Sequence, residues 1–198
     1  MLKRCKLIGA IACGMLFCAA SCEKKEIPIP RWSEKRVNDL YAIDLPFYLK
    51  EEKSMNDQAS LQYCNPDSGL YIVGLEDAKE NLGEIHAKKK DIHEYFLFTE
   101  EHAFKGSDSM KVDTAQFLEG FYFDNKPEKI KMKLGDYEVT QTLKDSTYQL
   151  FYRIVVFENK THYVPIVIWR NALKSCEELK LIDSITNSFK MLPQSKDI

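Results

Sequence analysis

Two apolar stretches, YQLFYRIVVF at residues 148–157 and HYVPIVIW at residues 162–169, decide the fold of this chain. Both are rich in β-branched and aromatic residues, and the polar segment between them is short enough for a hairpin loop. In the first stretch apolar residues fill both alternating sets of positions: Leu150, Tyr152, Ile154 and Val156 in one, Phe151, Val155 and Phe157 in the other. A strand that is apolar on both sides needs cover on both sides. The sequence therefore predicts a long hairpin inside a layered domain.

The cover on one side is predicted to come from a helix near the C-terminus. Apolar residues recur there every three or four positions, as in an amphipathic helix: Leu173, Cys176, Leu179, Ile182, Ile185, Phe189 and Leu192. A second helix is predicted over residues 77–103, where apolar residues have a similar spacing. Helices before and after the hairpin predict layers on both sides of the sheet.

Further strands are predicted from alternation and turn residues in three regions, residues 41–49, 59–75 and 130–141. The first contains Pro46, which indicates an edge strand or a strand broken at the proline. The second has a central turn cluster of Asn, Pro, Asp, Ser and Gly and reads as a hairpin. The third is predicted to be two short strands around a turn at Gly135 and Asp136. Residues 111–123 fit either a helix or a strand.

The order of these elements resembles the PsbP-like superfamily, which includes the envelope protein DcrB. The resemblance covers roughly residues 40–192 and is carried by these segments: IDLPFYL, ASLQYCNPDSGLYIVGL, LGDYEVTQT, the hairpin quoted above and SITNSFKML. It implies an α+β fold with an antiparallel β-sheet sandwiched between helices. It also implies a binding or assembly role without a common active site, although a fold alone does not give a function.

The N-terminus has the layout of a secretory signal peptide. Lys3, Arg4 and Lys6 precede an uncharged run from residue 7 to residue 20. As a helix this run would rise only about 21 Å, against roughly 30 Å of hydrocarbon in a bilayer, so it is too short for a good membrane span. We expect residues 1–21 to be removed.

The end of this segment resembles the lipobox of bacterial lipoproteins, in which small residues precede a lipidated cysteine. Ala19, Ala20 and Ser21 precede Cys22, and Ala19 stands where leucine is commonest, so the match is to a relaxed form of the motif. The resemblance implies that Cys22 is lipidated and begins the mature protein; an ordinary cleavage site is the alternative. The expected organisation is a tether over residues 22–38, the domain over residues 39–193 and a tail over residues 194–198.

The mature chain would keep Cys64 and Cys176 in an oxidising compartment, so a disulfide between them is one expectation. The alternative is that they are free thiols, because Cys176 falls on the apolar stripe of the closing helix and free cysteine is often buried. Four triplets that begin with aspartate, at Asp108, Asp113, Asp145 and Asp183, resemble acceptors for periplasmic O-glycosylation. The first three lie in or beside predicted loops, with Ser109, Thr114 and Ser146 as the acceptor residues.

The sequence contains none of the common motifs for catalysis or cofactor binding. G-x-S-x-G, G-x-G-x-x-G and H-E-x-x-H are all missing. His86 and His93 lie seven positions apart on the predicted helix, a spacing that favours ordinary histidines over a metal site. The chain has a formal net charge of −2 at pH 7 and no basic run beyond Lys88 to Lys90, so it has no electrostatic signature of nucleic-acid binding. We therefore expect no enzymatic activity, no cofactor and no metal.

The aromatic cluster Phe121, Tyr122 and Phe123 is either an anchor for a partner or part of the core, and the core is favoured.

The functional hypothesis is a lipid-anchored binding or assembly module for another envelope protein. An envelope hydrolase with an unrecognised site and a carrier of a small ligand or metal are the alternatives. Glu23 is not the aspartate that typically retains lipoproteins in the inner membrane. The expected location is the outer membrane of a Gram-negative bacterium, facing the periplasm.

Overall fold

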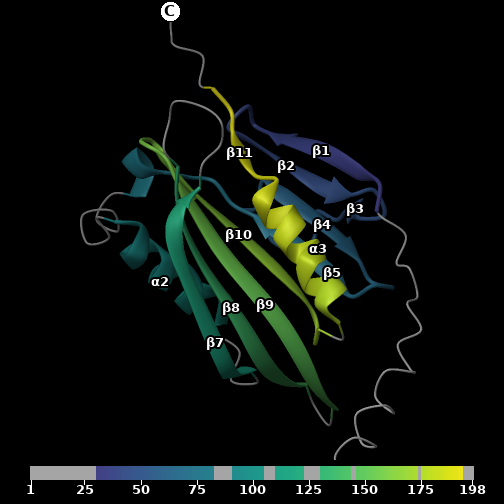
Figure 1. Ribbon diagram of the computed structural model, residues 1–198. Helices are drawn as coiled ribbons and strands as arrows, with labels where there is room; N and C mark the ends of the chain where they lie inside the picture. The colour runs from purple at the N-terminus through teal and green to yellow at the C-terminus, as the bar shows by residue number, and fades with distance from the viewer. Residues whose placement is uncertain are drawn as a thin grey trace, which may run out of the picture.

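A large antiparallel sheet forms the centre of the computed structural model (Figure 1). The structure describes residues 30–82, 91–104, 110–122, 130–143, 146–173 and 175–193. The strands of this sheet lie in the order β3-β4-β5-β10-β9-β8-β7, and β6 pairs with β10 beyond the end of β5. Their bounds are Lys50–Glu51 (β3), Leu61–Asn65 (β4), Leu70–Gly74 (β5), Asp77–Ala78 (β6), Met110–Tyr122 (β7), Ile130–Leu143 (β8), Ser146–Glu158 (β9) and His162–Asn171 (β10).

A smaller sheet packs on one face of the large one. It has the order β1-β2-β11, with bounds Trp32–Val37 (β1), Tyr41–Pro46 (β2) and Lys190–Met191 (β11). Chain segments far apart in sequence meet here, because β11 near the C-terminus pairs with β2 near the start of the domain. The smaller sheet therefore ties the two ends of the domain together.

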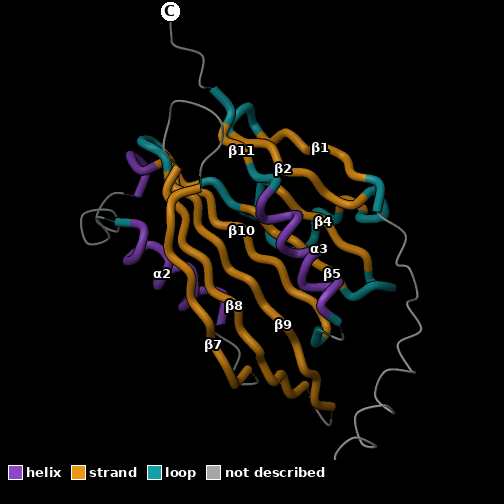
Figure 2. The backbone as a smooth tube through the Cα atoms, viewed as in Figure 1, coloured by secondary structure: helices purple, strands orange, loops and turns teal. Residues whose placement is uncertain are grey.

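Helices lie on both faces of the large sheet (Figures 1 and 2). The α-helix α2 (Ile92–Phe104) begins after Asp91, whose Oδ1 accepts a hydrogen bond from Glu94 N at 2.9 Å. The α-helix α3 (Cys176–Asn187) begins after Ser175, which accepts from Glu178 N. Both starts are ordinary helix caps. A short 3₁₀ helix, η1 (Lys79–Leu82), follows β6.

The predicted hairpin of β9 and β10 is confirmed, and it lies in the middle of the sheet. Ile154, Val156 and Tyr163 pack with α2, whereas Phe151, Val155 and Phe157 pack with α3 and the smaller sheet. Ile154, Val155, Val156 and Phe157 are each 0% exposed. Leu150 is only half-buried, because β9 extends beyond the end of β10 at that point. The expected cover on both faces is present, with the smaller sheet as an unpredicted part of it.

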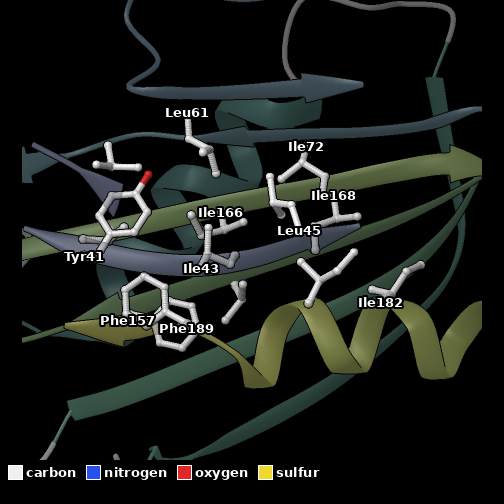
Figure 3. Packing of buried hydrophobic residues seen from close by; sticks show 14 of the residues in the cluster. Tyr41, Ile43, Leu45, Leu61, Ile72, Phe157, Ile166, Ile168, Ile182 and Phe189 are labelled. Carbon is white, nitrogen blue, oxygen red and sulfur yellow. The ribbon is translucent and has the colours of Figure 1, made fainter. Parts of the chain in front are cut away.

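The core beneath α3 is built around stacked aromatic rings (Figure 3). The rings of Phe157 and Phe189 lie 3.7 Å apart between centroids, and Tyr41 stacks on Phe189 at 5.3 Å. Stacked rings of this kind add to the stability gained from their buried area. Because the three residues come from β9, β2 and the segment after α3, the stack joins the two sheets and the helix.

Several predicted boundaries are wrong. Residues 130–143 form one continuous strand, β8, and Gly135 is not in a turn. A Cβ on Gly135 would lie 2.6 Å from Tyr137 Oη and 2.9 Å from Phe96 Cζ, so the position needs glycine because two rings lie over it. The helix predicted over residues 77–103 starts only at Ile92, since residues 77–82 form β6 and η1. The ambiguous segment from residue 111 onward is strand β7.

The segment expected to be a tether contains a strand. Residues 32–37 form β1, which pairs with β2, and only Val37 at its end is buried. A strand with mostly exposed side chains carries no apolar alternation, and for this reason the sequence did not indicate it. Strand β2 ends at Pro46, which confirms the prediction of a strand broken at the proline. The alternative prediction of an edge strand is wrong, because β2 is the central strand of its sheet. Among the described residues no helix is both long and apolar enough to cross a membrane.

Candidate functional site

A buried arginine lies in the middle of the face that β9 turns toward α3. Its neighbours on that face, Phe151, Val155 and Phe157, belong to the apolar core, whereas Arg153 is 4% exposed and carries a charge. A buried charge is costly unless it is paired and hydrogen-bonded. The partners of Arg153 therefore define the polar centre of this part of the molecule.

Two aspartates pair with Arg153. Its Nε and Nη2 donate to the two carboxylate oxygens of Asp136 on β8, both at 2.7 Å, in a bidentate arrangement. Its Nη1 donates to Asp183 Oδ1 on α3 at 2.7 Å. Burial works against the charged guanidinium, but the hydrogen bonds and charges of Asp136 and Asp183 outweigh burial and raise the pKa of Arg153. The arginine stays charged throughout the ordinary pH range.

A pocket of about 300 Å³ opens beside this charge cluster. The sheet forms the floor of the pocket, α3 forms one wall, and β7, the edge strand of the sheet, forms the rim. Its lining residues are Gln116, Phe117 and Leu118 from β7, Met132, Leu134 and Asp136 from β8, Arg153 from β9, and Asp183, Thr186 and Asn187 from α3. Asp183 has 46% of its side chain exposed, so part of the acidic charge faces solvent.

The pocket carries a net negative charge, because two carboxylates surround one guanidinium. Its apolar floor of Met132 and Leu134 would suit the aliphatic part of a long side chain. The partly exposed carboxylate of Asp183, on the wall formed by α3, would suit a cationic end group. The pocket is therefore fitted to a basic side chain and not to an anion.

Strand β7 is the outermost strand of the sheet beside this pocket (Figure 2). In the part of the chain that the structure describes, β7 pairs with β8 alone. All residues from Lys111 to Leu118 are exposed, and Phe117 and Leu118 are each 58% exposed. A bulge between Val112 and Thr114 interrupts the register with β8. A long outer strand with exposed apolar side chains is a template for pairing with another strand.

The residues singled out from the sequence do not converge on this site. Cys22 and Ser109 lie outside the described residues. Thr114 lies inside β7 and not in a loop, and it donates to Glu138 Oε2 at 2.9 Å. Ser146 is exposed at the start of β9. Phe121 and Tyr122 belong to β7, but their side chains and Phe123 lie outside the described part.

Both cysteines of the domain are free thiols. Cys64 is buried in β4, and Cys176 is exposed at the start of α3. The expectation that Cys176 is buried on the apolar stripe is wrong, because the first turn of α3 projects beyond the core. The buried residues of this helix begin only at Ile182.

The histidines of the described segments have separate neighbours. His93 Nδ1 contacts Lys133 Nζ, His102 Nδ1 contacts Phe98 O at 2.8 Å, and His162 Nδ1 contacts Thr161 Oγ1 at 2.8 Å. His86 lies outside the described residues. Within the described segments, no group of three or more His, Cys, Asp or Glu side chains is placed to hold a metal ion.

Sequence reasoning missed Arg153 and its partners. The signal was present, because Arg153 is the one charged residue within the apolar stretch YQLFYRIVVF. Asp136 was assigned to a turn, and Asp183 was noticed only as part of a sugar-acceptor pattern. Neither assignment placed a carboxylate next to the arginine.

Comparison with known proteins gives a likeness of fold only. No protein-family model and no curated protein matches the chain. Among solved structures, the Ran-binding protein Mog1p of Saccharomyces cerevisiae matches with a TM-score of 0.50 and 12% identity, covering 82% of this chain and 96% of that one. A point mutant of Mog1 matches equally, with a TM-score of 0.50 and 12% identity, covering 83% of this chain and 98% of that one.

A cyanobacterial PsbP from Synechocystis also matches, with a TM-score of 0.49 and 14% identity, covering 84% of this chain and 95% of that one. The chain thus has an α+β fold of the Mog1p kind, with a mostly antiparallel sheet and two α-helices among the described residues.

Proposed function

We propose that this chain is a non-catalytic protein-binding module, held in the cell envelope by a lipid on Cys22. The observation that carries the proposal is the open edge of β7 beside an acidic pocket. The fold likeness to Mog1p, a Ran-binding protein, supports a binding role for this architecture. For this chain, the ligand is inferred from the β7 edge and the acidic pocket and not from the ligand of Mog1p.

The partner is an extended segment with a basic side chain. It adds a strand to β7, so that its backbone makes the hydrogen bonds and alternate side chains face the pocket. One apolar side chain of the partner covers Leu118, and the basic side chain reaches Asp183 over Met132 and Leu134. Arg153 and Asp136 hold Asp183 in place from below.

We infer the envelope location from the N-terminal residues alone. A diacylglyceryl group on Cys22 would hold the domain at a membrane, and we propose the periplasmic face of the outer membrane of a Gram-negative bacterium. Two or three acyl chains bury enough CH₂ groups, at about 0.8 kcal/mol each, for lasting attachment. Confinement to one membrane raises the effective concentration of the domain toward a partner there, so a weak interface suffices.

A carrier of a small basic ligand is the second candidate. A pocket of about 300 Å³ is at the lower end of the size range for small-ligand sites. Of the polar side chains that line the pocket, Asp136 and Asp183 are joined through Arg153, an arrangement suited to holding a charged group.

The test is crosslinking in intact cells followed by mass spectrometry. The lipidated protein should recover a reproducible envelope protein, and a Cys22→Ala form exported through another signal peptide should recover much less. Labelled palmitate should enter the first form and not the second. The proposal is wrong if neither form recovers a partner while the soluble form turns over a substrate in a broad hydrolase screen.

A further inference from the structure

A group of exposed aromatic residues lies where the chain enters the domain. Trp32 begins β1, and Phe47 and Tyr48 follow directly after β2; their side chains are 38%, 74% and 37% exposed. Trp32 pairs with Pro46, and Phe47 N donates to Arg31 O at 2.7 Å, so the three aromatic residues stay together beside the entering chain. We call Trp32, Phe47 and Tyr48 the entry patch.

Other exposed apolar residues gather at the same end of the large sheet. Asn65 at the end of β4 donates to Tyr48 O at 3.1 Å and pairs with Leu70 at the start of β5. Leu70 pairs with Arg170 of β10, and the next residue of β10, Asn171, pairs with Leu150 of β9, so these strand positions lie at one end of the sheet. Leu143 and Tyr148 lie beyond this level, at the joined ends of β8 and β9, and are 50% and 46% exposed.

The distribution of exposed apolar side chains is therefore uneven. Of the nine large exposed hydrophobic residues among those described, six lie at this end: Trp32, Phe47, Tyr48, Leu143, Tyr148 and, through its pairing with Val139, Val112. Scattered apolar residues need no explanation, but a concentration at one end indicates an interaction surface. Tryptophan and tyrosine in particular favour the boundary between water and lipid, because each ring has an apolar body and a polar tip.

The length of chain before the domain identifies what this end faces. Only seven residues, 23–29, separate Cys22 from Pro30, the first described residue, so the eight steps from Cys22 to Pro30 span at most about 28 Å when fully extended. If Cys22 is lipidated, Pro30 is held within that distance of the bilayer surface, and Trp32 of the entry patch follows two residues later. The exposed charges next to the patch balance, with Arg31 and Lys50 basic and Glu51 and Glu52 acidic, so its contact with lipid rests on the aromatic side chains.

We propose that the entry patch docks on the bilayer that holds Cys22, inserting Phe47 and Trp32 into the lipid interface and setting the orientation of the domain. This inference rests on the proposed anchoring at Cys22. The bilayer fixes the end of the sheet where the chain enters, and the β7 edge and its pocket lie along the side of the sheet, free for a partner protein. One surface therefore serves the membrane and another serves the partner.

The experiment measures the depth of Trp32 in phosphatidylcholine vesicles. The mature chain, residues 22–198, carries Trp169→Phe, so that Trp32 is the only tryptophan, and Cys176→Ser, so that Cys22 is the accessible thiol beside the buried Cys64. Coupling Cys22 to a maleimide lipid tethers the protein at the same residue whether or not cells lipidate it. A patch seated about 5–10 Å into the interface brings Trp32 within reach of bromines on the acyl chains.

We expect brominated acyl chains to quench the emission of Trp32 strongly and a water-soluble quencher to lose access to it. Phe47→Ser should remove most of the lipid quenching, whereas Leu97→Ser, an exposed residue of α2, should leave it unchanged. The inference is overturned if bromines do not quench Trp32, or if they quench it equally in Phe47→Ser. Protection from the soluble quencher without bromine quenching would mean that protein covers the patch, which also overturns it. Mass spectrometry of the cellular protein decides separately whether Cys22 is acylated.

Discussion

At the scale of single residues, Arg153 is a buried charge on an otherwise apolar face of β9, and its pairing with Asp136 and Asp183 offsets the cost of burying it. Replacing Arg153 with Met would keep the volume but leave Asp136 and Asp183 without their cation. Removing one partner of a buried pair costs about 3–5 kcal/mol, and the partial exposure of the two aspartates lowers the expected loss to about 2–3 kcal/mol. Urea denaturation of Arg153→Met measures this loss in the free energy of unfolding.

The matched control for Arg153→Met is Asp183→Asn. Asp183 is nearly half exposed, and Arg153 keeps its bidentate bond to Asp136, so the loss should stay below about 1 kcal/mol. An Arg153→Met protein as stable as the wild type would mean that the cluster does not support the fold.

Buried tyrosines make stability depend on alkaline pH. Burial raises the pKa of Tyr152 to about 12, and burial with the nearby carboxylates of Glu158 and Asp91 raises the pKa of Tyr163 to about 12. The folded-state pKa of each tyrosine lies above the unfolded value near 10. The stabilisation from keeping the buried hydroxyl protonated is therefore complete below about pH 10 and is lost as the pH rises toward 12. Each tyrosine should lower the free energy of unfolding by about 1.4 kcal/mol per pH unit in that window.

Urea denaturation at several pH values, combined with tyrosinate absorbance, measures this effect. Absorbance should show the buried tyrosines protonated until the protein unfolds. A free energy of unfolding that stays constant from about pH 10 to about pH 11 would contradict the buried placement of both rings.

At the scale of elements, β9 is the strand on which both core layers depend. Ile154 is 0% exposed and packs under α2, so Ile154→Ala should lower the free energy of unfolding by about 2–5 kcal/mol. Leu143→Ala, at an exposed position on the neighbouring strand, should cost less than about 0.5 kcal/mol. A loss below about 0.5 kcal/mol for Ile154→Ala in a chemical melt would place β9 at the surface.

Elements with a strong apolar pattern could be predicted, and elements shaped by tertiary contacts could not. The hairpin of β9 and β10 and the closing helix follow from alternation and from spacing of three or four. The turn predicted at Gly135 was wrong because that glycine serves the close approach of Phe96 and Tyr137, a contact between distant segments. Strand β1 was missed because its side chains are mostly exposed.

The candidate site was beyond sequence reasoning for a related reason. Arg153 stands out in its apolar stretch, but its partners lie 17 and 30 residues away, on β8 and α3. Their convergence depends on the register of β8 with β9, which places Asp136 opposite Arg153. A one-residue change of that register would turn Asp136 to the other face of the sheet.

At the scale of the whole molecule, we propose that the domain has two surfaces with different tasks. The end where the chain enters is aromatic and is assigned to the bilayer, and the β7 side with its acidic pocket is assigned to a protein partner. The helix α2 covers the opposite face of the sheet from this pocket and takes no part in either surface. This separation allows membrane attachment and partner binding to be tested by independent substitutions.

The central claim is that a partner protein binds along β7, and site-specific photo-crosslinking in intact cells tests it most directly. A photoreactive residue in place of Leu118 should give one discrete adduct, whereas the same residue in place of Leu97 on α2 should not. Asp183→Lys, which puts a like charge against the basic side chain of the partner, should reduce the Leu118 adduct about tenfold, equivalent to about 1.4 kcal/mol. No adduct from Leu118, or an adduct unaffected by Asp183→Lys, would contradict the account.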